Sequence, residues 1–159
     1  MLMITENRSR AEGGLCRSKG DITVKVLKVE AKKEKLREVL SFLDEELEAL
    51  DCDMKTVFAL DLAVEEIYVN IASYAYGDGE GEAEISLDFS EADNMFTVTF
   101  RDSGFQYDPL AKEDPDVTLS LEERKIGGLG IFMVKKNVDD MTYEYKDGQN
   151  VLSLKKKIR

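Results

Sequence analysis

The sequence contains no histidine among its 159 residues, and only two cysteines and two prolines. Without histidine, the chain can build neither a histidine-ligated metal site nor a histidine general base. Cys16 and Cys52 show no metal-ligand spacing and no disulfide framework, which is typical of the reducing cytoplasm. No apolar run approaches the roughly 20 residues that a transmembrane helix needs. The first residues also lack the apolar centre of a secretory signal, so we expect a cytoplasmic protein without a membrane partner.

Basic residues are scarce in the body of the chain. The net charge is −11, and residues 21–154 alone hold 14 basic and 31 acidic residues, a net of −17. Such a body repels nucleic acid, so we expect no direct nucleic-acid partner. The length fits a single domain at residues 21–159, preceded by a flexible arm at residues 1–20.

The hydrophobic pattern of the first half predicts one strand and two helices. Residues 21–31 alternate like a strand, and residues 32–50 carry a leucine stripe with the period of an amphipathic helix. A second helix is expected at residues 54–76, with Asp53 as its N-cap. Its apolar seam consists of Val57, Leu60, Val64, Ile67, Ile71 and Tyr74.

The second half predicts two strand pairs separated by a loop and a helix. Two strands flank a turn near residues 91–94, and residues 107–125 have the composition of a long loop or lid. A glycine-rich turn and a short helix follow, with Lys135 and Lys136 in the last turn, and a hairpin with its turn at Asp147-Gly148 closes the chain. This order predicts an α+β two-layer sandwich.

A carboxylate and an amide lie one turn apart on the second predicted helix. At about 100° per residue, Glu66 and Asn70 stand on the same shoulder of the apolar seam, whereas Glu65 faces solvent. Such an oxygen-bearing pair suits Mg²⁺, which takes a few hard oxygen ligands together with water and phosphates. The alternative is that Asn70 only caps the backbone of a neighbouring loop.

Two further stretches carry chemistry. Asp102 follows a predicted strand end, where its carboxylate can accept a hydrogen bond from an exocyclic amine, and Gly104 lets a flat ring approach the backbone. An ordinary Asp-Ser-Gly turn is the alternative. The glycines Gly127, Gly128 and Gly130 precede a helix start, where free N–H groups can hold phosphate oxygens.

The three stretches together, "EIYVNIASYAY", "DSGFQYDP" and "GGLGIFMV", resemble the N-box, G1-box and G2-box of the GHKL ATPases. Within that superfamily, which includes gyrase and the histidine kinases, the chain is most similar to anti-sigma factor serine/threonine kinases. The resemblance covers about residues 22–157. It implies the Bergerat-type two-layer α/β sandwich, with a mixed, mostly antiparallel sheet and its helices on one face.

The resemblance also implies cofactors and residue roles. ATP and Mg²⁺ would bind, with Asn70 as the magnesium ligand, Glu66 as the general base, and Asp102 and Gly104 at the adenine. The phosphates would lie against a glycine-rich group of residues: Gly127, Gly128, Leu129, Gly130 and Ile131. The segment 107–125 would be the ATP lid.

Two functions remain after related classes are excluded. A histidine kinase needs a phosphoacceptor histidine, which the chain lacks, and a gyrase-like ATPase needs transducer domains. The chain is therefore expected to phosphorylate a serine or threonine of an antagonist (anti-anti-sigma-like) protein, in a circuit that regulates transcription. Alternatively, it is an ATP-dependent module that sequesters a sigma factor or another partner without turnover. A homodimer is also expected by resemblance.

Overall fold

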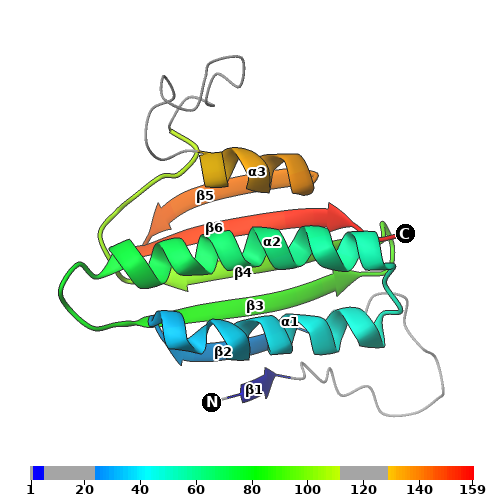
Figure 1. Ribbon diagram of the computed structural model, residues 1–159, viewed down its shortest axis with the longest axis horizontal. Helices are drawn as coiled ribbons and strands as arrows, with labels where there is room; N and C mark the ends of the chain where they lie inside the picture. Colours follow the sequence, from blue (N-terminus) through cyan, green and yellow to red (C-terminus); the bar gives the residue numbers. More distant parts are fainter. Residues whose placement is uncertain (1, 6–23, 112–128) are drawn as a thin grey trace, which may run out of the picture.

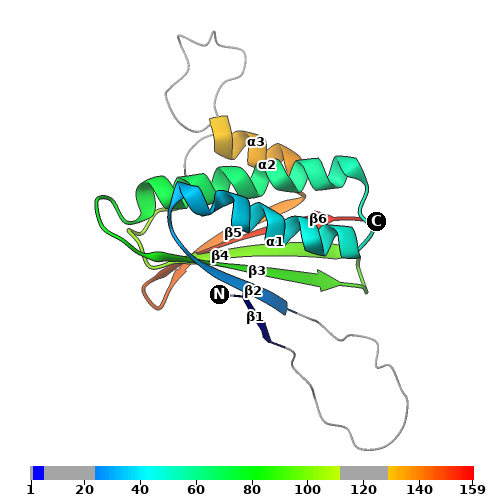
Figure 2. The ribbon, with the colours of Figure 1, turned by 60° about the horizontal axis from the view of Figure 1, so that its bottom comes forward.

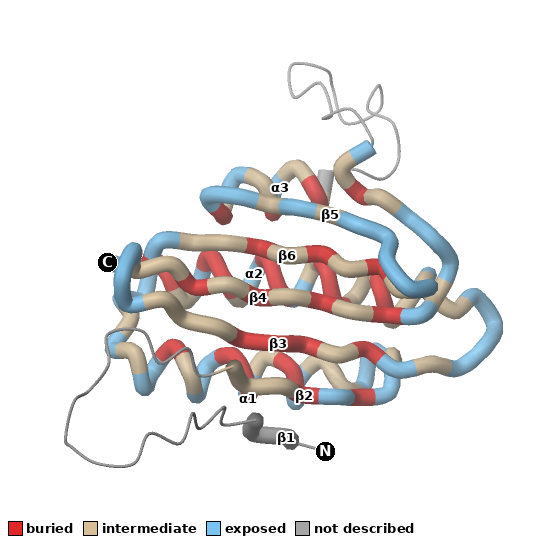
Figure 3. Tube along the Cα trace, turned by 180° about the vertical axis from the view of Figure 1, so that it is seen from behind, coloured by how far each residue is buried: buried red, intermediate tan, exposed pale blue. Residues whose placement is uncertain are grey.

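Three α-helices cover one face of an antiparallel sheet in the computed structural model, which describes residues 2–5, 24–111 and 129–159 (Figure 1). Figure 2 shows the two layers from another side, and Figure 3 shows the sheet face opposite the helices. This is the predicted α+β two-layer sandwich. The elements are β1 (Leu2–Thr5), β2 (Val24–Glu30), the 3-10 turn η1 (Lys33–Lys35), α1 (Leu36–Ala49), α2 (Met54–Asn70), the π-helical turn η2 (Ile71–Ala75), β3 (Glu82–Ser90), β4 (Met95–Asp102), α3 (Leu129–Asn137), β5 (Asp140–Lys146) and β6 (Gln149–Lys157).

The strands of the described residues form one sheet in the order β1-β2-β3-β4-β6-β5. Each neighbouring pair among them is antiparallel. The mostly antiparallel sheet is therefore confirmed, whereas the parallel pair that a mixed sheet would contain does not occur in this part of the chain. Along β4, buried and half-buried residues alternate because successive side chains point to opposite faces. Phe96, Val98 and Phe100 thereby face the helices and form the middle of the core.

The helix α2 lies between α1 and α3 and packs its apolar seam on the sheet (Figure 1). Leu60, Val64 and Ile67 are buried there, as the periodicity predicted. Asp53 is the predicted N-cap, since its Oδ1 accepts a hydrogen bond from the Thr56 N–H at 2.8 Å. The sequence therefore determined both the start and the buried face of this helix.

The end of α2 differs from the predicted regular helix. The α-helix stops at Asn70 and continues as one π-helical turn, Ile71–Ala75. A π-turn joins residues i and i+5, so it holds more residues per turn than an α-helix and shifts those that follow around the axis. Tyr74, which the sequence assigned to the apolar seam, is consequently 73% exposed, although Ile71 is buried. The predicted seam is wrong at this position.

An edge strand at the N-terminus and a hairpin near the C-terminus complete the described fold. Residues Leu2–Thr5 form a strand that pairs with β2, which satisfies backbone groups of these four residues. The flexible arm expected at residues 1–20 otherwise stays a prediction. Residues 6–23, the lid residues 112–125, and Gly127 and Gly128 lie outside the described residues. Asp147 and Gly148 have φ values of 54° and 76° and form the predicted hairpin turn between β5 and β6. Among the helices described, none has the length and apolarity needed to cross a bilayer.

Candidate functional site

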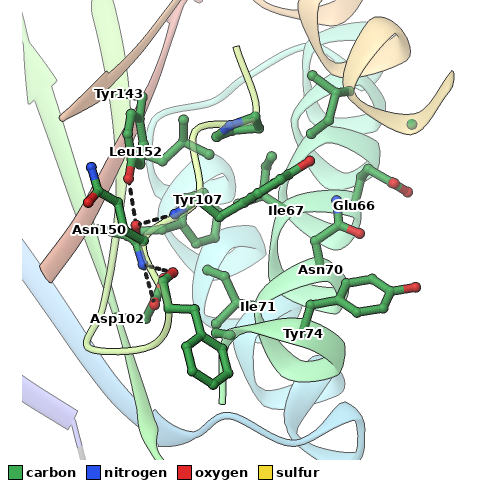
Figure 4. A pocket seen from close by; sticks show the side chains of 17 residues that line it. Glu66, Ile67, Asn70, Ile71, Tyr74, Asp102, Tyr107, Tyr143, Asn150 and Leu152 are labelled. Atoms are coloured by element: carbon green, nitrogen blue, oxygen red, sulfur yellow. Dashed lines mark hydrogen bonds between the residues drawn. The ribbon is translucent and has the colours of Figure 1, made fainter. Parts of the chain in front are cut away.

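A cavity of about 690 Å³ lies between the C-terminal half of α2 and the sheet. In Figure 4, Glu66 and Asn70 stand on the helix side, while Asp102 and Asn150 stand on the sheet side. Gly130, from the start of α3, also lines the cavity. Described residues from all three stretches that the sequence singled out therefore meet around one cavity.

The carboxylate of Asp102 is fixed at the sheet side. Asp102 ends β4 and is only 6% exposed. Its Oδ1 accepts hydrogen bonds from the Gly104 N–H and from Asn150 Nδ2, both at 3.0 Å. Within the described part of the chain, Oδ2 has no hydrogen-bond partner. One oxygen is thus held in place by the protein, and the contact of the other with an exocyclic amine stays a prediction.

Asn150 is the centre of this arrangement, and the sequence analysis missed it. It lies opposite Asp102 in the β4–β6 register and is 7% exposed. Its Nδ2 also donates to the Phe105 carbonyl at 2.8 Å. Its Oδ1 accepts from the Tyr107 N–H at 3.1 Å and from the Tyr143 hydroxyl at 2.6 Å (Figure 4). All the hydrogen-bonding groups of one amide are therefore used to position the loop after β4.

The tyrosine hydroxyls around this loop remain donors. Burial raises the pKa of Tyr143, so it stays protonated at neutral pH and donates to Asn150. Burial also raises the pKa of Tyr76. The Tyr76 hydroxyl donates to the Glu82 carbonyl at 2.5 Å and accepts from the Ser103 N–H at 2.9 Å. These bonds connect the loop after β4 to the end of η2 and to β3.

Gly104 has a different neighbour from the predicted one. It does not line the cavity, and a Cβ on Gly104 would lie 2.1 Å from the Ala75 carbonyl oxygen. The same carbonyl accepts a hydrogen bond from the Phe105 N–H at 2.8 Å. Glycine is needed here because the loop packs directly on the backbone of η2. The structure thus gives Gly104 a packing role, and its place beside a bound ring stays a prediction.

Glu66 and Asn70 are both half-buried and face the cavity, whereas Glu65 is exposed, in agreement with the helical angles. A Cβ on Gly130 would lie 1.8 Å from Glu66 Oε1, so the carboxylate packs against the first turn of α3. Among the residues described, the Asn70 side chain has no hydrogen-bond partner. The alternative role for Asn70, as a cap of a loop backbone, therefore finds no partner in the described part of the chain.

The predicted phosphate-binding glycines are only partly described. Gly127 and Gly128 lie outside the described residues, and α3 begins at Leu129. Gly130 and Ile131 line the cavity, where the Ile131 side chain is buried. The N–H groups of the first turn of a helix have no intrahelical acceptors and carry the positive end of the helix dipole. This end of the cavity is therefore suited to an anion.

Comparisons with known proteins agree with this geometry. A family model, the histidine kinase-like ATPase domain, matches residues 29–156, which is most of the chain. The chain belongs to this family. This ATPase domain is 30% identical over 97 residues to the serine/threonine-protein kinase BtrW of Bordetella bronchiseptica, covering 61% of the chain and 68% of the relative. It is 29% identical over 100 residues to the serine-protein kinase RsbW of Listeria monocytogenes, covering 60% and 63% respectively.

A solved structure shares the fold of this ATPase domain. The crystal structure of the RsbU and RsbW domains of Rv1364c from Mycobacterium tuberculosis superimposes with a TM-score of 0.59 at 15% identity. The match covers 84% of the chain and 32% of that protein. At this identity the likeness shows the fold alone. The solved structure thus confirms the expected fold, and the family model confirms the family expected from the three motifs.

The described residues fit a magnesium-bound adenine nucleotide. Asp102 Oδ2 is available to an exocyclic amine, the Asn70 amide is available as an oxygen ligand, and the first turn of α3 is available to phosphate. In the described residues no group of three or more histidine, cysteine or acidic side chains could hold a metal ion. Asn70 alone would therefore act with phosphate oxygens and water as ligands, an arrangement that Mg²⁺ commonly adopts.

Proposed function

We propose that this domain is a protein kinase that uses Mg²⁺ and ATP to phosphorylate a serine or threonine hydroxyl of a partner protein. The observation that carries the proposal is the place of Glu66, whose carboxylate packs against the first turn of α3 beside Asn70. Holding a nucleotide requires no carboxylate at that place. A base at that place is instead what an incoming hydroxyl needs.

Each side chain has a separate part in the proposed reaction. Bound MgATP would supply the γ-phosphoryl group, and ADP would be the leaving group. Asp102 accepts a hydrogen bond from the adenine amine through Oδ2, and Asn150 holds Asp102 in position. Asn70 provides an oxygen ligand to the metal, and the N–H groups of Leu129, Gly130 and Ile131 stabilise phosphate charge. Glu66 accepts the proton of the attacking hydroxyl.

The partner in this proposal is an antagonist protein of the anti-anti-sigma type, with a sigma factor as a second partner. Support comes from the relatives, which are named as serine/threonine- and serine-protein kinases. The proposal includes a cytoplasmic location, a role in transcription regulation and a homodimeric form. Electrostatic attraction between the acidic chain, of net charge −11, and a basic partner surface would speed association.

The test compares two neighbouring carboxylates on α2. Glu66→Gln removes the base without changing its size, so phosphate transfer from radiolabelled ATP to purified antagonist candidates should fall by about 10²–10⁴-fold. ATP affinity, measured by calorimetry, should remain unchanged. Glu65→Gln is the matched control, because Glu65 is exposed and does not line the cavity.

Two outcomes would change the proposed function. Equal transfer rates for both variants and the unaltered protein would show that Glu66 is not the base. Absence of any transfer, together with capture of a partner that depends on ATP, would favour the binding module over the kinase.

A further inference from the structure

An apolar stripe lies on the face of α2 that points away from the sheet. Met54, Phe58 and Leu62 follow one another at four-residue intervals, so they lie one above the other along the helix. They are 79%, 65% and 40% exposed, respectively. Large apolar side chains gathered in one exposed row mark an interaction surface more often than scattered ones do.

The stripe is separate from the nucleotide site. The cavity is lined by Glu66, Ile67 and Asn70 of α2, and none of the three stripe residues contributes to it. On α3, Met133 is also exposed, and α3 packs beside α2 (Figure 1). A ligand on the stripe would therefore touch the outer surface of the helical layer and leave the cavity open.

An acidic row borders the stripe on the side of α1. Asp61 and Glu65 continue along α2, and Asp44 of α1 lies close to Asp61. Burial, followed by the carboxylates of Asp44 and Glu65, raises the pKa of Asp61 to about 7. Asp61 Oδ1 is buried and has no hydrogen-bond partner among the described residues. Among the described residues, no lysine or arginine forms an ion pair with Asp44, Asp61 or Glu65.

We infer that the stripe of Met54, Phe58 and Leu62 is a docking surface for an amphipathic helix of a partner protein, with Lys or Arg on the edge that meets Asp44, Asp61 and Glu65. Apolar anchors one turn apart match the spacing of side chains on such a helix. A lysine or arginine on that edge would pair with the exposed carboxylates of Asp44 and Glu65. A second copy of this chain fits less well on the stripe, because it would place the same acidic row opposite this one.

The experiment uses a synthetic peptide, because no natural partner is needed. The probe is an amphipathic helical peptide of about 18 residues, five turns, with leucines on one face and lysines along one edge. A peptide of the same composition in scrambled order separates docking from attraction to the acidic protein in general. Binding is measured by fluorescence anisotropy with the full chain, and its location by methyl NMR shifts of Met54, Leu62 and Met133.

The amphipathic peptide should bind and the scrambled peptide should bind at least tenfold more weakly. Phe58→Ala should lower affinity about tenfold, which is typical of an interface anchor, and Asp61→Asn should lower it about threefold. Asp78→Asn, which removes an exposed carboxylate elsewhere, is the matched control. ATP affinity should be unchanged in Phe58→Ala, so this result does not depend on the proposed kinase activity.

Three results would overturn the inference. Equal binding of the two peptides would show charge attraction alone. NMR shifts confined to the cavity or to the sheet would place the peptide elsewhere. Concentration-dependent dimers of the unaltered protein that Phe58→Ala converts to monomers, as measured by light scattering, would assign the stripe to a second copy of the chain.

Discussion

Asn150→Ala should remove the hydrogen bonds that hold Asp102 and the loop after β4 on the sheet. The substitution removes four hydrogen bonds, to Asp102, the Phe105 carbonyl, the Tyr107 N–H and the Tyr143 hydroxyl. A hydrogen bond contributes about 0.5–1.5 kcal/mol net, and a buried partner left unsatisfied costs about 1–3 kcal/mol. Because water in the cavity can replace Asn150 at some of these partners, we expect the free energy of unfolding to fall by about 2–4 kcal/mol in total.

The same substitution should also weaken ATP binding. Asp102 Oδ1 would keep only the Gly104 N–H as a partner. The carboxylate could then rotate away from the adenine amine, whose hydrogen bond it is proposed to accept. We expect ATP affinity to fall at least tenfold, about 1.4 kcal/mol. Urea denaturation measures the free energy of unfolding. Calorimetry at a temperature where the variant is folded measures the ATP affinity.

Asn137→Ala is the matched control for this experiment. Its side chain is partly exposed and makes one hydrogen bond, from Nδ2 to the Met133 carbonyl at 2.8 Å. We expect its free energy of unfolding to fall by about 0.5 kcal/mol or less and its ATP affinity to stay unchanged. A loss below about 1 kcal/mol for Asn150→Ala, with ATP binding intact, would refute the central role of Asn150.

Two further substitutions test other parts of the molecule. Asn70→Ala should make ATP binding independent of Mg²⁺ at little cost in stability, since alanine favours the helix; calorimetry with and without Mg²⁺ that shows the usual Mg²⁺ response would make Asn70 structural. Asp61 has its folded pKa raised from 3.8 to about 7, so its protonated form contributes stability below pH 4 that is lost as the pH rises through 7. A difference of about three pKa units would correspond to about 4 kcal/mol in the free energy of unfolding. Solvent screening of this partly exposed carboxylate reduces that contribution to about 1–2 kcal/mol. Asp61→Asn should therefore flatten the decline between pH 4 and 8 in urea titrations, and an unchanged slope would contradict the raised pKa.

Local patterns in the sequence determined most of the secondary structure. Alternating residues in β4 and the seam of α2 around Leu60 and Ile67 report which side faces the core, because each depends on a short repeat. The cap at Asp53 and the turn at Asp147-Gly148 are also local, so both were predictable. The order of the three motifs further predicted the family. The π-turn that exposes Tyr74 lacks such a signal.

Only the tertiary structure decided which side chains meet. Asp102 and Asn150 are 48 residues apart, and the register of β4 with β6 brings them together. A signal existed, since Asn150 is a polar residue on the inward face that continues with Leu152, but its partner could not be read from the sequence. The close contact of Glu66 with Gly130 likewise depends on how α3 packs on α2. Periodicity specifies the face that each element buries, whereas strand register and helix packing, which are set by the whole core, specify the contacts across it.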